Sequence, residues 1–190
     1  MLKKVAVAVF VMSFIAVSSY AASLKPYIGV KVGGANETAK IDCSSDYGSD
    51  VVQKNNGWAA FGAIDLGVKY GPLRAEAEYG YRDYTEYERG SDNESYRGRM
   101  QTYFLNFYLD FPTKFFLKPY FNAGAGWAGI DAEAGGDTSN MFAYNVGLGL
   151  TYRLSKSFNI DCGYRYVKVN RLYDLDLGSH DLYAGLRYKI

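Results

Sequence analysis

Three consecutive residues near the end of the chain, Ser179, His180 and Asp181, have the side-chain types of a hydrolase triad. A triad needs its nucleophile, base and acid within hydrogen-bonding distance of one another. Successive side chains of a β-strand point to opposite faces, so these three cannot form a relay among themselves if they lie in a strand. His180, the only histidine, would need a serine or an acid from a neighbouring strand. An enzyme that modifies lipids is therefore our third hypothesis, and we expect no enzymatic activity.

A second motif, at residues 124–129, fits the glycine pattern G-x-G-x-x-G of dinucleotide-binding sites. Such a site needs the motif between a strand and a helix, with an acidic residue about 20 positions further on. Here the motif lies inside a strand-like segment, where Gly124 and Gly126 would make room for long side chains. The two cysteines are far apart, without metal-binding spacing, and the formal net charge is +1. We therefore expect no cofactor, no metal site and no nucleic-acid partner.

Charged residues form the most extensive candidate site, because they recur on the polar side of segments with two-residue alternation. If the segments close into a narrow barrel, these eight basic and five acidic side chains line its lumen: Lys31, Asp65, Lys69, Arg74, Glu76, Glu78, Arg82, Asp110, Arg153, Asp161, Arg165, Arg187 and Lys189. In a lumen only wide enough for side chains, they should pair into a ladder that fills it. The alternative is a narrow pore with a slight preference for anions, given the excess of three positive charges.

Eight alternating segments would position these side chains, beginning near residues 25, 57, 73, 98, 117, 141, 157 and 180. Long and short connections alternate between them without exception. The short ones carry turn residues, such as Gly71-Pro72 and Ser155-Lys156-Ser157. The expected fold is all-β: an eight-stranded antiparallel up-and-down transmembrane barrel, since barrels of this kind alternate short turns with longer outer loops.

The first 21 residues indicate a secretory signal peptide, followed by a barrel domain over residues 22–190. Lys3 and Lys4 precede an apolar run over 5–17 that is short for a membrane-spanning helix. We predict cleavage between Ala21 and Ala22, after the small residues of Ser19-Tyr20-Ala21. The alternative is an N-terminal membrane anchor.

The apolar face of each strand is expected to point outward into lipid. The opposite face mixes glycines with charges, which suits a narrow lumen, and aromatic residues cluster near both strand ends, as in interfacial girdles. Those near the loop side are Trp58 and Trp127, and those near the turn side are Tyr70, Phe111, Tyr152, Phe158 and Tyr188. At the outer interface we expect His180 to cap the last strand. The alternative is a soluble barrel with its apolar face inward.

The segments PYIGVKVGG, PLRAEAEYGYR, LNFYLDF, PYFNAGAGWAG and DCGYRY resemble the small eight-stranded outer-membrane family of opacity proteins and OmpA/OmpX-type barrels. The likeness covers about residues 24–190. It implies an outer-membrane location, contact with outer-membrane lipid, and delivery to the barrel-assembly machinery. The terminal strand resembles the family's assembly signal at Tyr188, but departs from it at Ile190, where the family usually has phenylalanine. A closed barrel needs no partner for stability, so we expect a monomer.

Four polar loops are expected near 35–56, 86–97, 131–140 and 168–179, and the fourth is the most apolar. That loop is either a contact patch or a strand pair that extends past the membrane. Cys43 falls in the first loop and Cys162 on an apolar strand face, so we expect two free thiols. Our first hypothesis is a structural or interaction barrel that binds an extracellular ligand through its loops, and the second is the narrow pore.

Overall fold

The computed structural model describes residues 24–41, 56–89, 94–132, 139–172 and 175–190. The predicted cleavage site at Ala21 and Ala22, and Cys43, lie outside these residues. The described chain forms eight long strands: β1 (Lys25–Ile41), β2 (Asn56–Tyr70), β3 (Leu73–Arg89), β4 (Glu94–Asp110), β5 (Leu117–Ala132), β6 (Ser139–Arg153), β7 (Phe158–Leu172) and β8 (Leu175–Lys189).

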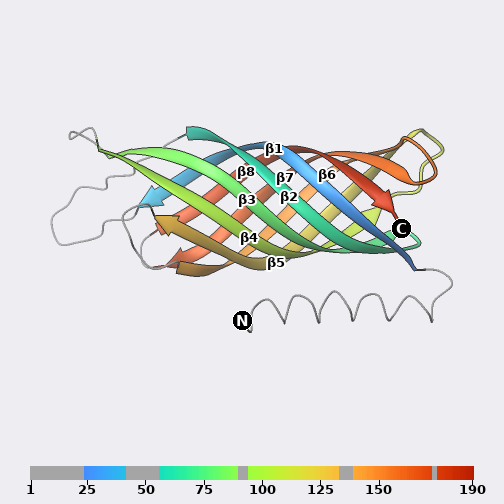
Figure 1. Cartoon of the computed structure of the whole chain (residues 1–190), viewed down its shortest axis with the longest axis horizontal. Helices are drawn as coiled ribbons and strands as arrows, with labels where there is room; N and C mark the ends of the chain where they lie inside the picture. Colours follow the sequence, from blue (N-terminus) through green and yellow to red (C-terminus); the bar gives the residue numbers. More distant parts are fainter. Residues whose placement is uncertain (1–23, 42–55, 90–93, 133–138, 173–174) are drawn as a thin grey trace.

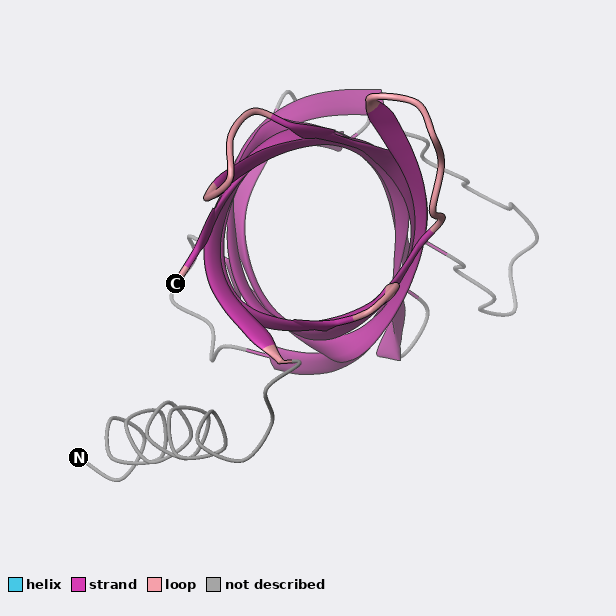
Figure 2. Cartoon of the chain, turned by 90° about the vertical axis from the view of Figure 1, so that its right-hand side faces the viewer, coloured by secondary structure: helices cyan, strands magenta, loops and turns pink. Residues whose placement is uncertain are grey.

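The strands close into one barrel in sequence order, as Figures 1 and 2 show. Every neighbouring pair is antiparallel, and the last strand returns to the first, with Val30 opposite Leu186. Short turns such as Gly71-Pro72 lie at one end, where β1 also begins and β8 ends. Gly71 has a φ of 56°, a conformation that suits the two-residue turn between β2 and β3. The predicted eight-stranded up-and-down fold is confirmed.

Two expected loops are mostly strand. We placed the starts of the fourth and eighth strands near 98 and 180, whereas β4 begins at Glu94 and β8 at Leu175. The polar residues of 86–97 favour a loop, but paired strands satisfy their backbone groups equally well outside a membrane. In the fourth connection the pairing continues to Leu172 opposite Leu175. The backbone there is thus an extended strand pair.

The barrel wall is split at its loop end. Pairing between β2 and β3 stops at Phe61 opposite Arg82, and pairing between β6 and β7 stops at Ala143 opposite Val169. Beyond Arg82, β3 pairs only with β4 among the described strands, after a register shift between Arg82 and Thr85. The β3–β4 pair therefore continues past the closed part of the barrel (Figure 1).

The outer face is apolar and the lumen is polar, as predicted. Large apolar side chains are exposed along the strands, among them Ile28, Val30, Ile64, Phe107 and Leu148. The alternative of a soluble barrel with an apolar interior is wrong. Inside the described wall, buried apolar side chains form two small clusters, one around Phe104 and Val167, the other around Phe61. The described part of the chain contains no helix that could span a lipid bilayer.

Candidate functional site: the charged lumen

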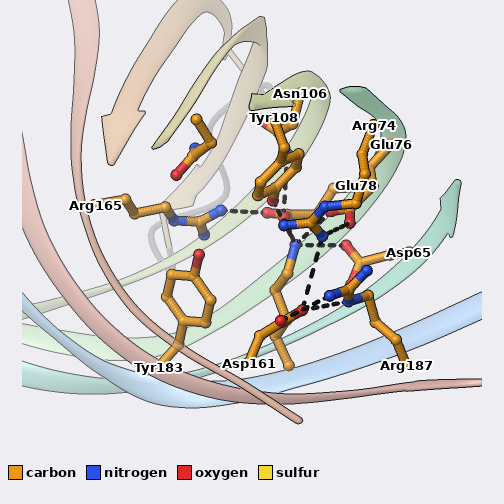
Figure 3. A network of polar contacts seen from close by, with 12 residues as sticks. Asp65, Arg74, Glu76, Glu78, Asn106, Tyr108, Asp161, Arg165, Tyr183 and Arg187 are labelled. Carbon is orange, nitrogen blue, oxygen red and sulfur yellow. Dashed lines mark hydrogen bonds and ion pairs between the residues drawn. The ribbon is translucent and has the colours of Figure 1, made fainter. Parts of the chain in front are cut away.

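Lys31 lies at the centre of the lumen and is surrounded by three carboxylates. Its ammonium nitrogen donates to Asp65 at 2.9 Å, to Glu76 at 3.0 Å and to Glu78 at 2.7 Å, and the hydroxyl oxygen of Tyr108 lies 3.1 Å from the same nitrogen. These side chains come from β1, β2, β3 and β4, because alternate residues of each strand point inward. All are buried. Figure 3 shows the carboxylates and their arginine partners converging from opposite walls.

From this centre an ion-pair chain runs toward the loop end. Arg165 on β7 donates to Glu78 at 2.5 Å and to Asp181 at 2.9 Å. Nη2 of Arg82 on β3 donates to both carboxylate oxygens of Asp181, and Nη1 donates to Glu37 at 2.8 Å. The two arginines thus join opposite sides of the lumen through one aspartate.

A second branch runs toward the turn end. Arg74 donates to Glu76 at 3.1 Å and to Asp110 at 2.9 Å, and its guanidinium lies 3.8 Å from Asp161. Asp110 accepts from Lys69, and Asp161 accepts two bonds from Arg187. Together the branches form one continuous series of ion pairs along the lumen, which we call the lumen network.

The lumen network is close to neutral. It contains six bases, Lys31, Lys69, Arg74, Arg82, Arg165 and Arg187, and seven acids, Glu37, Asp65, Glu76, Glu78, Asp110, Asp161 and Asp181. The expected excess of three positive charges is therefore wrong for the described lumen. Charges removed from water in this way need close partners, and each of these has at least one.

Tyrosine rings and amides fill the space between the charges. The guanidinium of Arg74 lies 4.2 Å from the ring centre of Tyr108 and 5.1 Å from that of Tyr120, within cation–π range. Tyr27 donates its hydroxyl hydrogen to Glu76 at 2.6 Å. On the wall formed by β4–β6, Asn122, Asn145 and Asn106 are linked in series, and the series ends on Glu78.

Glycines make room for these rings. Tyr120 and Tyr183 share a hydroxyl–hydroxyl hydrogen bond of 2.9 Å over the backbone of Gly163. A Cβ at Gly163 would lie 2.6 Å from the Tyr183 ring. Gly124, part of the glycine motif, faces Asn106 and Asn145 in the same way, and the motif lies wholly within β5. The strand context lacks the helix that a nucleotide site needs.

The structure buries ten of the thirteen predicted lumen residues and leaves Lys69 and Lys189 half-buried. Arg153 is the exception: it is exposed and donates to the carbonyl of Ser155 in the β6–β7 turn. Thr151 is the last residue of β6 that points into the lumen. Alternation assigns Arg153, two residues later, to the same face, but the strand ends at Arg153.

Sequence reasoning missed two lumen acids, Glu37 and Asp181. Glu37 fell in a segment assigned to the first loop, and Asp181 was considered only as part of a triad. Alternation could have found both, since Glu37 shares the face of Lys31 and Asp181 shares the face of Arg187.

The apparent triad is divided by the barrel wall. Ser179 and Asp181 are buried in the lumen beside Arg82, whereas His180 is exposed on the outer face. His180 Nδ1 lies 2.6 Å from the hydroxyl of Tyr164, and its ring packs against Tyr166 at 5.1 Å. These neighbours supply neither the serine nor the acid that a lipid hydrolase would need.

Three carboxylates around Lys31 have the geometry of a cation site, because one oxygen each of Asp65, Glu76 and Glu78 lies within 4.8 Å of the others. The ammonium of Lys31 bonds to all three. The ammonium group of Lys31 therefore occupies the position that a metal ion would take between the three carboxylates.

Residues on the outer face lie where the two-residue alternation of their strands predicts. Cys162 is exposed on the outer face with a free thiol. Tyr188 packs on Phe158 at 5.0 Å, also on the outer face. The terminal Ile190 is exposed, and its N–H donates to the carbonyl of Pro26.

Comparison with known proteins gives a family match over nearly the whole chain. The sequence profile described as outer membrane protein beta-barrel domain matches residues 7–189. The outer membrane protein PagN of Salmonella typhimurium is 26% identical over 155 residues, covering 62% of this chain and 65% of PagN. The chain therefore spans just under two thirds of this relative's length.

Solved structures share the fold. Neisserial surface protein A has 19% identity and a TM-score of 0.65, over 86% of this chain and 97% of that one. The outer membrane enzyme PagL has 15% identity and a TM-score of 0.51, over 84% and 97%. At these identities the likeness concerns the fold alone, and one fold can carry different functions.

Proposed function

Since the chain belongs to the outer membrane protein β-barrel domain family, we propose that this outer-membrane barrel has a closed lumen and acts at the cell surface through its loop end. It is thus a transmembrane barrel, with the turns on the periplasmic side and the loop end outside, as in other bacterial barrels. We expect a monomer delivered to the membrane by the barrel-assembly machinery.

The continuous lumen network is the observation that carries this proposal. A conducting pore needs a water-filled path, yet Glu78 forms ion pairs with both Lys31 and Arg165 across the middle of the barrel. Anion preference would also need a surplus of positive charge, which the balance of six bases and seven acids removes. The lumen network therefore supports a role in stabilising the barrel and not a role in transport.

The extended β3–β4 pair supports a surface role. It continues beyond the part of the wall that β2 closes, so it forms a strand pair outside the closed barrel. Binding residues commonly lie on such outer connections, held by a stable scaffold. An extracellular ligand would bind to this part of the loop end.

The test shortens the projecting pair without disturbing the barrel. Thr85 lies opposite Gly98, so an Asn-Gly turn can replace residues 86–97 between these paired positions. Bacteria displaying the wild type or the shortened barrel are added to epithelial monolayers and to matrix-coated plates. We expect binding to fall in the shortened variant while the folded form, recognised by its mobility before and after heating, persists.

Two results would contradict the proposal. Full binding by a folded barrel in which all four outer connections are shortened would remove the surface role. Discrete channel openings of the wild-type protein in a planar bilayer would contradict the closed lumen. A control with Lys114→Gln and Lys156→Gln at the opposite end of the barrel should bind as the wild type does.

A further inference from the structure

An apolar groove crosses the outer face of the barrel between β1, β8, β7 and β6. It has a volume of about 480 Å³. Ala184 and Cys162 lie opposite each other and form the floor of the groove, because their side chains are small. Larger side chains flank them on both sides. The flanking side chains are Val32, Leu148, Leu150, Tyr164 and Leu182.

The groove runs obliquely along the barrel. Its central row follows the register from Leu150 to Cys162, Ala184 and Val32. Leu150 lies near the turn-side end of β6, whereas Val32 lies further up β1. Because barrel strands are tilted by about 35–45°, a row across them is itself inclined to the membrane. A flexible chain entering from the outer leaflet could follow this direction.

A polar pair stands at the loop-side border of the groove. Tyr164 lines the groove and its hydroxyl lies 2.6 Å from Nδ1 of His180, which is exposed. When the hydroxyl donates to Nδ1, the neutral ring carries its hydrogen on Nε2 and can donate it outward. His180 and Trp58 both lie opposite Asn36, on the two strands that flank β1, and tryptophans mark the membrane interface.

We propose that this groove binds one acyl chain of an outer-leaflet lipid, with the polar head group of that lipid hydrogen-bonded by His180. The surrounding lipid is as apolar as the groove, so the hydrophobic effect gives no preference for it. Selectivity comes from van der Waals contact along the depression and from the donor at its upper end. The bound lipid lies outside the barrel, in the membrane, and the lumen remains closed.

A second copy of the chain fits the groove less well. Dimers form most often about a two-fold axis, which brings the same patch of both copies together. The depression at Ala184 and Cys162 would then face its own copy and leave a void. A flexible acyl chain fills the same space without that penalty.

The experiment counts lipid molecules that stay with the barrel. The full-length protein is reconstituted in nanodiscs of phosphatidylethanolamine and phosphatidylglycerol, with or without lipopolysaccharide, then released in mild detergent for native mass spectrometry. Ala184→Leu fills the groove, and Cys162→Leu does so independently. Ala125→Leu is the matched control, because Ala125 is exposed on the outer face of β5, away from the groove.

We expect the wild type and Ala125→Leu to retain one lipid, and both groove-filling variants to retain it about tenfold less, which corresponds to 1.4 kcal/mol. His180→Ala should keep a lipid but lose its preference among head groups, and the lipopolysaccharide sample identifies which lipid is preferred. Equal retention by all folded variants would overturn the proposal. So would a dimer that replaces the lipid and disappears with Ala184→Leu.

Discussion

Lys31 Nζ lies 2.7 Å from Glu78 Oε2 in the middle of the barrel, and both side chains are buried. The two residues belong to strands that are not neighbours, so the contact spans the lumen across β2. An ion pair in this position contributes to stability only while its partners remain.

Replacing Lys31 by methionine should therefore destabilise the barrel strongly. Lys31→Met keeps much of the side-chain volume but leaves Asp65, Glu76 and Glu78 without their shared cation. Removing one member of a buried pair typically costs about 3–5 kcal/mol. Urea unfolding of the protein in lipid vesicles, followed by tryptophan fluorescence, measures the free energy of unfolding. Lys118→Met, at an exposed position of β5, is the control and should change it by less than about 0.5 kcal/mol.

The same variant should acquire a response to divalent cations. Without the ammonium, three carboxylates whose oxygens lie within 4.8 Å of one another form an anionic cluster. Calcium prefers oxygen ligands of this type. We expect calcium to raise the unfolding midpoint of Lys31→Met while leaving the wild type unchanged, and Glu76→Gln in the same background to abolish the response. An equal response of wild type and variant would show that the cation acts elsewhere.

Gly163→Ala tests the packing of the tyrosine pair. The added Cβ would meet the rings of Tyr120 and Tyr183, which have little room to move inside the lumen. Overpacking of this kind costs about 1–3 kcal/mol. Gly62→Ala is the matched control, because the nearest atom to its Cβ, the carbonyl oxygen of Lys31, is 3.8 Å away. Similar unfolding curves for the two variants would contradict the role assigned to Gly163.

Ile190→Phe tests the departure from the family's terminal signal. The side chain of Ile190 is exposed, so the substitution should change the free energy of unfolding by less than about 0.5 kcal/mol. We expect a larger fraction of newly made protein to reach the heat-modifiable folded form in cells. Tyr188→Ala, which removes the ring that packs on Phe158, should lower that fraction. An unchanged fraction for both variants would exclude these residues from the assembly signal.

The alternation of residue types was sufficient to predict the barrel and most of its lumen residues. Lys31, Arg74 and Arg165 face inward because one face of a strand repeats every second residue. Alternation gives no information about which inward residues meet. The bonds from Lys31 to Glu76 and Glu78 depend on the register of β1, β2 and β3 together, and register is set by packing across the whole sheet.

The ends of the strands were the second feature that the alternation of residue types could not predict. Arg153 was placed in the lumen and Glu37 outside it, since the pattern does not mark where the wall stops. The paired segments beyond Arg82 are polar, and a polar sequence favours a loop. Pairing of the backbone, and not apolar character, holds these residues in strands.

The seam between β1 and β8 has a consequence for how the protein is made. Ile28 lies opposite Tyr188, and the N–H of Ile190 donates to the carbonyl of Pro26, so the end of β8 pairs with the start of β1. Until β8 has been synthesised and the barrel closes, both of these strands have an unpaired edge, which is a template for aggregation. Contacts between such distant parts of a chain also form slowly. The unfolded polypeptide must therefore be protected from aggregation on its way to the membrane. Pairing of β8 with β1, which closes the barrel, comes after all eight strands have been synthesised.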